Sequence, residues 1–523
     1  MVKKRYYLIG AALIVLLSSF FMIRINGYVD SQMHLKVIMQ STYANTLNQA
    51  LFSFLLTVFG FALLYCFKDI LRTNVAIILA PIVGTFLWAF FSIIILCLRI
   101  PYTGFVMISC LLLVLAVCII VKKLKLKEIS ISNLGIILAV YFAFALVFSV
   151  FDFLIFSEDT YTHILLGKAL ARESSLNPNL IEEYSAIPLM TASIFTPGEF
   201  FNFSGVNGLF TLFGFSFIVS ICYCIFIEIS KVLGEKKSLL VSGSIFLILL
   251  TSNLFTMIAM FYPMSNSLAN CALFFTVYFA YKAQKEDRFI YFSMFFLICF
   301  IWTRTESILI ACGLIFFFTN MKIKKKPVII CTIGCACALL LWYVTFFSIA
   351  GLDFSKGVFL TIERSGAVVV GLLMLIAYIT LSGKVSWIEK NRNRLDYLPF
   401  AVIILCLGLF TFLNPQKLIT NIKVIFANLS LLGLWGFTFI ILLAAMVIYY
   451  SFIKTYDIWD KTLWFYLLGL FFIFLFRVND LRLGLGDSGN RLLLAIVPFI
   501  VFMISTRLIP KLLSKQDGIQ SNK

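Results

Sequence analysis

The chain has 523 residues, of which 62% are hydrophobic and only 13% are charged. Soluble proteins are close to half apolar and about a quarter charged, so this composition excludes a string of soluble domains. The formal net charge of +18 does not indicate nucleic acid, because the basic residues gather in short runs between long apolar segments. The sequence therefore predicts an all-α, polytopic integral membrane protein, with anionic membrane lipids as the partner of its basic charge and no nucleic acid.

Apolar runs of about twenty residues recur along the whole chain. We expect about 16 transmembrane helices, with about 12 as the lower limit. The first run follows a basic start and resembles a signal peptide, but it is long and lacks a clear cleavage site, so we interpret it as an uncleaved span. The expected spans are 6–23, 47–67, 75–97, 105–121, 134–156, 207–227, 238–260, 265–282, 289–301, 307–319, 328–350, 367–382, 398–413, 425–450, 462–476 and 491–509.

The loops between these spans differ in charge. If alternate loops lie on opposite sides, the side of the N-terminus receives 29 of the 42 basic residues and the other side receives 13. The acids divide almost evenly, with 11 and 13 on the two sides. Short basic loops lie on the cytoplasmic side of a membrane. The pattern predicts a multi-pass protein of the cell membrane with both termini in the cytoplasm.

The longest polar segment is the loop 157–206, which this topology places on the outer face. Its start repeats apolar residues at helical spacing, while its charged residues point elsewhere. This pattern is typical of a helix that lies in the membrane interface instead of crossing the bilayer. The apolar positions are Tyr161, Leu165, Ala169 and Leu170, and the charged ones are Lys168, Arg172 and Glu173.

Two expected spans, 289–301 and 307–319, are too short to cross a bilayer unaided. A polar segment, 302–307, joins them and carries Arg304 and Glu306. A charged tip between short helices predicts a hairpin that ends at a water-filled cavity within the protein.

Three groups of ionisable residues lie at expected outer span ends. Charged side chains are energetically costly so close to the bilayer, so each group is a candidate functional site. The first is the adjacent pair Glu158 and Asp159. One of these acids is a candidate general base, because the nearby bilayer and the other carboxylate both raise its pKa. The alternative is that the acids only favour the start of a helix, where negative charge is stabilising.

The second group is Arg304 with Glu306, where the guanidinium is suited to hold a phosphate and the carboxylate to orient it. The alternative is a structural ion pair that keeps the tip hydrated. The third is the run 487–491, in which Arg491 lies near the positive end of the last expected span, where an anion would explain it. Its alternative is contact with outer lipid headgroups.

The sequence contains 13 cysteines, all within or at the edge of apolar runs, and two histidines, His34 and His163. These spacings match no zinc motif, so we expect the cysteines to pack in the core. We expect no metal site and no cofactor.

Three short segments together resemble the GT-C superfamily of membrane glycosyltransferases. FSEDTYTHILLGKALAR (156–172) is similar to the first external loop of that superfamily. TRTESILIA (303–311) is similar to the Arg-Pro-Glu-Gly type hairpin of bacterial members, with Thr305 and Ser307 in place of the Pro and the Gly. GNRLLLAIVPF (489–499) is similar to the late Arg-Tyr-Leu-Leu-Pro pattern, with Leu492 in place of the Tyr.

The resemblance is to bacterial, polyprenyl-phosphate-sugar-dependent members of the protein mannosyltransferase or aminoarabinose transferase type. It implies a glycosyltransferase core over 134–509, with 1–133 as a four-span addition and 510–523 as a cytoplasmic tail. It also implies a polyprenyl-phosphate-linked sugar as donor and a cell-envelope glycan, lipid or protein as acceptor. Asp159, then Glu158, takes the catalytic position, and the expected substrate contacts are Arg304, Glu306, Arg491, Tyr161, Lys168 and Arg172. In metal-dependent relatives this acid is a metal ligand, so a divalent metal at Asp159 is the alternative to a site without metal.

Two other classes of membrane protein also place arginines in a cleft. A transporter or flippase of lipid-linked sugars more often shows internal repeats and broken helices, and no repeat is evident in this sequence. A polysaccharide polymerase or ligase of the O-antigen type has long outer loops with arginine. Such enzymes seldom show an acidic loop followed by an interfacial helix, which is the pattern here.

Overall fold

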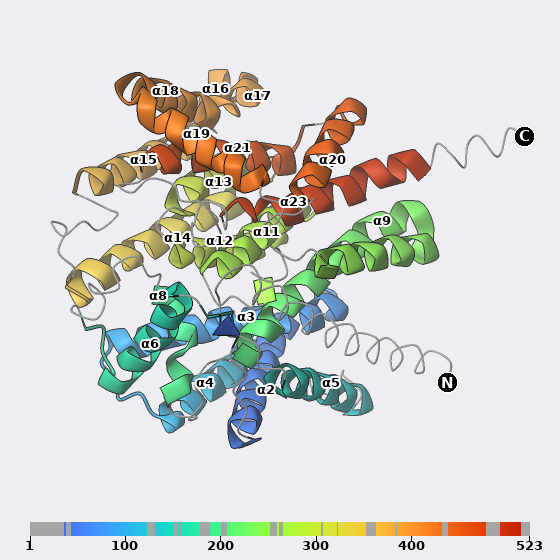
Figure 1. Cartoon of the computed structure of the whole chain (residues 1–523), viewed down its shortest axis with the longest axis vertical. Coiled ribbons are helices and arrows are strands. Elements are labelled where there is room, and N and C mark those ends of the chain that lie inside the picture. Colours follow the sequence, from blue (N-terminus) through green and yellow to red (C-terminus); the bar gives the residue numbers. More distant parts are fainter. Residues whose placement is uncertain are drawn as a thin grey trace, which may run out of the picture. The chain divides into compact units, whose positions relative to one another are not determined.

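The structure is a computed structural model, shown in Figure 1. It describes most of the chain, with gaps that include the expected first span and the 487–491 run. The described residues are 36–37, 43–122, 131–150, 155–156, 158–177, 189–199, 207–251, 259–260, 265–304, 307–321, 323–351, 362–382, 384–430, 438–454, 456–476 and 492–513.

Over these residues the chain is helical, apart from one short antiparallel pair in which Lys36–Val37 (β1) lies against Ile155–Phe156 (β2). The helices fall into two compact units. The first comprises Met1–Leu180 and Met190–Ser267, and the second comprises Ile181–Leu189 and Leu268–Lys523.

The first unit is built around two helices that cross closely through a pair of glycines. A Cβ on Gly60 would lie 2.0 Å from the carbonyl oxygen of Ala80, and a Cβ on Gly84 would lie 2.1 Å from that of Leu56. Small residues of this kind let two helix backbones approach within a membrane. The helices of the unit are α2 (Tyr43–Tyr65), α3 (Thr73–Cys97), α4 (Gly104–Lys122), α5 (Ile131–Val150), α6 (Glu158–Glu173), α8 (Leu189–Ile194), η2 (Thr196–Glu199) and α9 (Asn207–Thr251).

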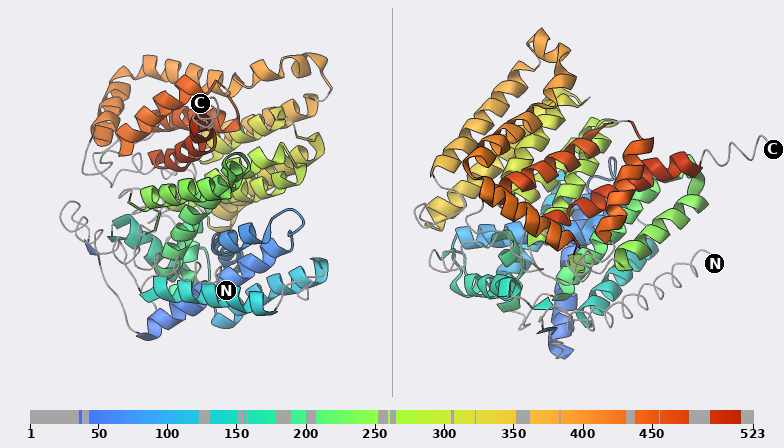
Figure 2. Two further views of the ribbon diagram at one scale, coloured as in Figure 1. Left: turned by 90° about the vertical axis from the view of Figure 1, so that its right-hand side faces the viewer. Right: turned by 45° about the horizontal axis from the view of Figure 1, so that its top comes forward.

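Helix α9 is 45 residues long, but it is two helices joined by a turn. Gly234 has φ 74° and ψ 164°, a backbone conformation that is essentially restricted to glycine. The chain folds back there, as Figure 2 shows in green. The turn carries the exposed side chains of Lys231, Lys236 and Lys237. This agrees with the two helices and the intervening charged loop expected at 207–227 and 238–260.

The second unit contains the remaining helices. They are α11 (Ser265–Ala283), η4 (Asp287–Phe289), α12 (Ile290–Thr303), α13 (Ser307–Asn320), α14 (Lys325–Tyr343), η5 (Val344–Ile349), α15 (Ile362–Leu381), α16 (Ser386–Lys390), α17 (Arg392–Leu395), α18 (Leu398–Leu413), α19 (Pro415–Ser430), α20 (Thr438–Phe452), α21 (Ile458–Phe476), α23 (Ile496–Met503) and η6 (Ile504–Leu508).

Large apolar side chains remain exposed on several helices of the second unit. Phe412 of α18 is 87% exposed and Met374 of α15 is 69% exposed, and neighbours such as Leu373 and Leu405 are exposed as well. Continuous apolar surface of this kind marks contact with a membrane or a partner. The chain therefore has the character of a polytopic membrane protein.

Six described helices are long and apolar enough to cross a bilayer: Leu47–Tyr65, Thr73–Cys97, Leu209–Leu250, Lys325–Phe346, Arg392–Leu413 and Ile496–Leu513. Several other apolar helices are shorter, and the α9 segment counts once although it folds back at Gly234. The expected number of about 16 spans stays a prediction, and the expected span 6–23 lies outside the described residues.

Two expected spans have different bounds in the structure. The span expected at 134–156 ends as helix α5 at Val150, and Ile155–Phe156 forms β2 instead. The span expected at 425–450 overlaps two helices, α19, which ends at Ser430, and α20, which begins at Thr438, and the residues between them lie outside the described part of the chain. An apolar run alone does not reveal where a helix ends, because the same short run suits a helix or a strand.

Candidate functional site

Helix α6 begins at the acidic pair that the sequence analysis selected. Glu158 and Asp159 are its first two residues, and Tyr161 follows in the first turn. Negative charge is favoured at this end of a helix, because the free backbone N–H groups there carry partial positive charge. The backbone of these three residues is described and their side chains are not. The structure thus confirms the predicted helix and its starting point.

One face of α6 is covered by protein, and the predicted apolar stripe lies partly outside that face. Leu170 is buried, but Leu165 and Ala169 are only partly buried, while His163 and Leu166 on another face are fully buried. The reason is that α6 packs on protein as well as facing outward: a Cβ on Gly167 would lie 2.3 Å from the carbonyl oxygen of Ala192 in α8. The segment 189–199 therefore determines which face of α6 is covered.

Two of the predicted substrate contacts lie on α6 beside one acidic residue. Arg172 makes a two-pronged ion pair with Glu199 of η2, with Nε–Oε1 at 3.0 Å and Nη2–Oε2 at 3.3 Å. The Arg172 side chain is 74% exposed, and that of Glu199 is 23% exposed. Burial lowers the pKa of Lys168, while the nearby Glu199 carboxylate acts in the opposite direction. Lys168, Arg172 and Glu199 form the cluster that we call the α6 cation cluster.

A buried group of hydroxyls joins this loop to the one after α3. The Tyr102 hydroxyl lies 2.7 Å from Ser92 Oγ and 2.5 Å from Thr196 Oγ1. The backbone N–H of Tyr102 donates to Ser174 Oγ at 2.8 Å. The expected outer loops 98–104 and 157–206 therefore lie at the same end of the first unit, as the alternating topology requires.

His163 was not selected by sequence reasoning as a site residue. It lies four residues after Asp159, one helical turn along the same face of α6, and its side chain is only 3% exposed. The spacing of an acid and a histidine by four residues was visible in the sequence. A buried histidine in an apolar run is as well explained by packing, so the spacing alone did not select it.

The other predicted arginine that the structure describes is Arg304, at the end of α12 in the second unit. Its backbone is extended, with φ −157° and ψ 145°, and its carbonyl accepts a hydrogen bond from Ser307 N at 3.2 Å. The predicted pair of short helices is confirmed as α12 and α13, each of 14 residues. Glu306 and Arg491 lie outside the described residues, so the convergence of these side chains with α6 stays a prediction.

Sequence reasoning also missed a set of contacts at one end of the second unit. Lys324 pairs with Asp287 at 3.0 Å, and Arg392 donates to the carbonyl oxygen of Thr319 at 2.6 Å. Lys461 pairs with Asp396, and Arg507 binds both Asp457 and Asp460. These contacts join the expected cytoplasmic loops 283–288, 320–327, 383–397 and 451–461 and the last helix at a single end. Loops that the charge rule assigns to one side are therefore together in this unit.

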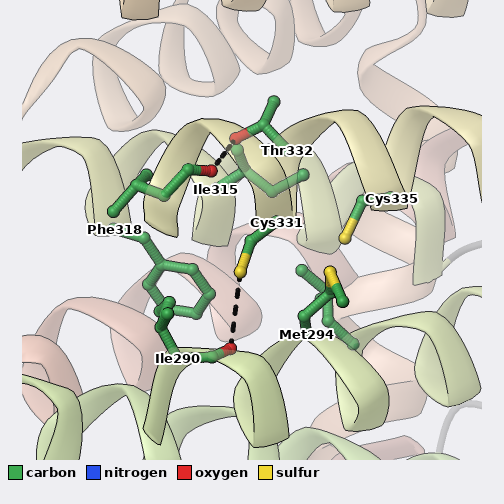
Figure 3. Close-up of a pocket in the computed structure, with 9 residues that line it drawn as sticks. Ile290, Met294, Ile315, Phe318, Cys331, Thr332 and Cys335 are labelled. Carbon is green, nitrogen blue, oxygen red and sulfur yellow. Dashed lines mark hydrogen bonds between the residues drawn. The ribbon is translucent and has the colours of Figure 1, made fainter. Parts of the chain in front are cut away.

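A small apolar cavity lies between α12, α13 and α14 (Figure 3). Its volume of about 10 Å³ has room for one water molecule, so it accommodates neither a sugar nor a lipid phosphate. Cys331 and Cys335 line it, and Cys331 Sγ contacts the carbonyl oxygen of Ile290 at 3.5 Å. Both cysteines are buried, as expected for cysteines that pack in the core.

Among the residues whose side chains are described, no group of three His, Cys, Asp or Glu side chains is arranged to hold a metal ion. Glu158 and Asp159 are not among them, so the alternative of a divalent metal at Asp159 stays open. No protein-family model, no curated protein and no solved structure matches this chain.

Proposed function

We propose that this chain is a membrane glycosyltransferase. It transfers a sugar from a polyprenyl-phosphate donor to a glycan, lipid or protein acceptor on the outer face of the cytoplasmic membrane. The proposal includes a GT-C-like bundle of about 16 spans, with its catalytic core at 134–509. The observation that carries it is α6, a helix that starts at Glu158 and Asp159 and carries Lys168 and Arg172 on its later turns.

The chemistry of such a transfer needs few protein groups. A glycosyl phosphate brings its own leaving group, so the enzyme does not have to protonate an alkoxide. It needs a base for the acceptor hydroxyl and cations for the departing phosphate. Asp159 is the proposed base, with Glu158 second. Lys168 is the proposed cation on α6, because Arg172 is already paired with Glu199 and orients that carboxylate.

The proposed contacts outside α6 are Arg304 and Glu306 at the tip between α12 and α13, Arg491 before α23, and Tyr161 on α6 itself. A guanidinium removed from water needs an anion to offset its desolvation, and a phosphate meets that need with matching geometry. The extended backbone at Arg304 ends α12, so its side chain emerges at a helix end and not along a packed helix face.

Substitution of Asp159 tests the proposal. Asp159→Asn should lower transfer from a polyprenyl-phosphate sugar by roughly 10²–10⁴-fold, which is the usual effect of losing a positioned base, while the protein still folds and binds donor. Asp69→Asn is the matched control, because Asp69 is an exposed acid of the same unit outside α6. If Glu158→Gln abolishes transfer and Asp159→Asn does not, the two roles are exchanged. If both variants transfer sugar normally, neither acid is catalytic, and the two acids only stabilise the start of α6.

The phosphate contacts are tested separately at limiting donor. Lys168→Gln, Arg304→Gln and Arg491→Gln should each raise the KM for the lipid-linked donor with little change in thermal unfolding. If a variant keeps normal turnover at limiting donor, the substituted residue does not contact the phosphate.

The products formed distinguish a glycosyltransferase from a flippase and from a polymerase or ligase. A flippase would move a fluorescent lipid-linked sugar across vesicles without forming a new glycosidic bond. A polymerase would join lipid-linked oligosaccharides into longer chains, and a ligase would transfer such a chain from its lipid to an acceptor.

A further inference from the structure

The connection between α15 and α18 is an elbow of two short helices, α16 and α17, which we define as residues 384–397 (Figure 1). One of its basic residues is committed to the protein itself. Arg392 Nη2 donates to the carbonyl oxygens of Thr319 at 2.6 Å and Met321 at 2.5 Å, at the end of α13. Cations at the end of a helix satisfy its last carbonyl groups. Arg392 therefore fastens the elbow to α13.

The other cations of the elbow face outward. Lys384, Lys390 and Arg394 are exposed, and Trp387 between them is 62% exposed. Tyr397 is 57% exposed, and its ring stacks on that of Tyr456, with 6.3 Å between centroids and an interplanar angle of 15°. We call the following six residues the elbow patch: Lys384, Trp387, Lys390, Arg394, Tyr397 and Tyr456.

More basic residues border the elbow patch. Lys325 Nζ donates to the carbonyl oxygen of Ser382 at 3.2 Å, which places the start of α14 beside it. Lys326 and Lys454 are exposed as well. Two nearby acids already have cations, since Asp287 pairs with Lys324 and Asp396 pairs with Lys461. The elbow also carries the exposed acid Glu389, which its three exposed cations outnumber. The surface is therefore positively charged, with aromatic side chains among the cations.

We propose that the elbow patch binds the headgroups of anionic phospholipids in the membrane leaflet at this end of the second unit. Tryptophan and tyrosine favour the depth of the headgroups, where an amphipathic ring meets both apolar and polar surroundings. Lysine and arginine there are attracted to anionic lipid. The exposed apolar side chains of Leu381 and Leu398 flank the elbow. Lipid tails would therefore contact these leucines, while the headgroups contact the cations of the elbow. This proposal does not depend on the glycosyl transfer proposed above.

The test uses the full chain in nanodiscs of phosphatidylcholine, with and without phosphatidylglycerol. The readout is hydrogen–deuterium exchange of the backbone over 384–397. Phosphatidylglycerol should slow this exchange, and high salt should remove the effect, because screening weakens attraction between exposed charges. Soluble glycerol phosphate at the same concentration should not slow it, which separates a lipid surface from a site for free phosphate.

Each cation near an anionic surface contributes about fivefold in association, so Lys390→Gln/Arg394→Gln should need at least roughly tenfold more phosphatidylglycerol for the same protection. Lys417→Gln/Lys423→Gln on α19 is the matched control, since it removes the same charge elsewhere in the unit and should keep the protection. Equal exchange of the unmodified protein in both kinds of nanodisc would overturn the proposal. So would equal loss of protection in the two double variants, because net charge would then explain the effect.

Discussion

Arg507 donates a hydrogen bond from Nη1 to Oδ2 of Asp460 at 3.1 Å, and the Asp460 side chain has no exposed surface. The same guanidinium donates to the Tyr449 hydroxyl at 2.7 Å and pairs with Asp457. Asp460 in turn accepts from the backbone N–H of Asp457 at 3.1 Å and from the Tyr450 hydroxyl at 3.0 Å. One arginine thus joins the last helix to the start of α21 and to the end of α20.

Loss of this arginine should be costly for stability. Arg507→Met leaves the buried Asp460 without its cation, and breaking a buried pair from one side typically costs about 3–5 kcal/mol. We expect a clear drop in the thermal unfolding temperature of the detergent-solubilised protein. Arg394→Met is the control, because Arg394 is exposed and surface changes stay within about 0.5 kcal/mol.

The cause can be separated from general damage with a second substitution. Asp460→Asn in the Arg507→Met background removes the uncompensated charge and should recover part of the lost stability. If Arg507→Met and Arg394→Met unfold at the same temperature, the network does not stabilise this end of the unit.

The turn at Gly234 gives a second prediction about stability. No neighbouring atom lies within 4 Å of a Cβ built there, so Gly234→Ala has no steric clash and reports only on the backbone. A residue other than glycine in that conformation costs about 1–3 kcal/mol. Gly243→Ala, which is also in open space but within a regular helical arm, should be neutral or stabilise by about 0.5–1 kcal/mol. The thermal unfolding temperature should therefore fall for Gly234→Ala and stay unchanged or rise for Gly243→Ala, and an unchanged or higher temperature for Gly234→Ala would contradict the assigned turn.

Local signals in the sequence were sufficient to predict the α9 hairpin and the α12–α13 pair. In α9, a glycine and a charged run interrupt an apolar segment that is too long for one span. In the α12–α13 pair, two short runs flank a charged tip at Arg304. Both are properties of neighbouring residues, which periodicity and composition capture directly.

Contacts between distant residues were not predictable in the same way. Arg507 and Asp457 are fifty positions apart, and Arg172 and Glu199 are joined only because α6 packs on α8 and η2. The face of α6 that is covered by protein also depends on Ala192 meeting Gly167, and the spacing of apolar residues does not reveal this contact. Side-chain pairing across helices is decided by tertiary packing, and a single sequence carries little information about it.

The α6 cation cluster predicts how Lys168 responds to pH. Burial lowers the pKa of Lys168, so this amine loses its proton at a lower pH than an ordinary lysine. The unfolded chain then holds more protons in that range, and the contribution of Lys168 to stability increases as the pH rises through the lowered pKa. If Lys168 holds a phosphate, donor binding should weaken over the same range.

Two variants should move this pKa in opposite directions. Glu199→Gln removes a carboxylate that favours the charged amine, so the pKa of Lys168 should fall further. Arg172→Gln removes a nearby positive charge, so the pKa should rise. The pH dependence of amine acylation at Lys168, followed by peptide mass spectrometry, measures both shifts. Shifts of the same sign would show that Glu199 and Arg172 do not govern this lysine.

The last prediction concerns which loops share a side of the membrane. Tyr102 is bonded to Ser174 and Thr196, so a cysteine at Thr103 and one at Ser175 should be labelled from the same side. In the second unit, contacts link the loops from Lys324 to Asp460. A cysteine at Lys326 and one at Lys454 should therefore also be labelled from one side of the membrane. The basic loops further predict that the first pair is outside and the second is cytoplasmic.

Single cysteines in a background without the 13 native ones, treated with a membrane-impermeant maleimide, test both levels of this prediction. In intact cells, Thr103→Cys and Ser175→Cys should react, whereas Lys326→Cys and Lys454→Cys should react only after the membrane is broken. If both pairs stay together but their accessibility is reversed, the packing is right and the orientation is wrong. That result would move Asp159 to the cytoplasmic side and exclude transfer from a donor on the outer face. If Thr103→Cys and Ser175→Cys react from different sides, the hydroxyl cluster at Tyr102 does not join these loops.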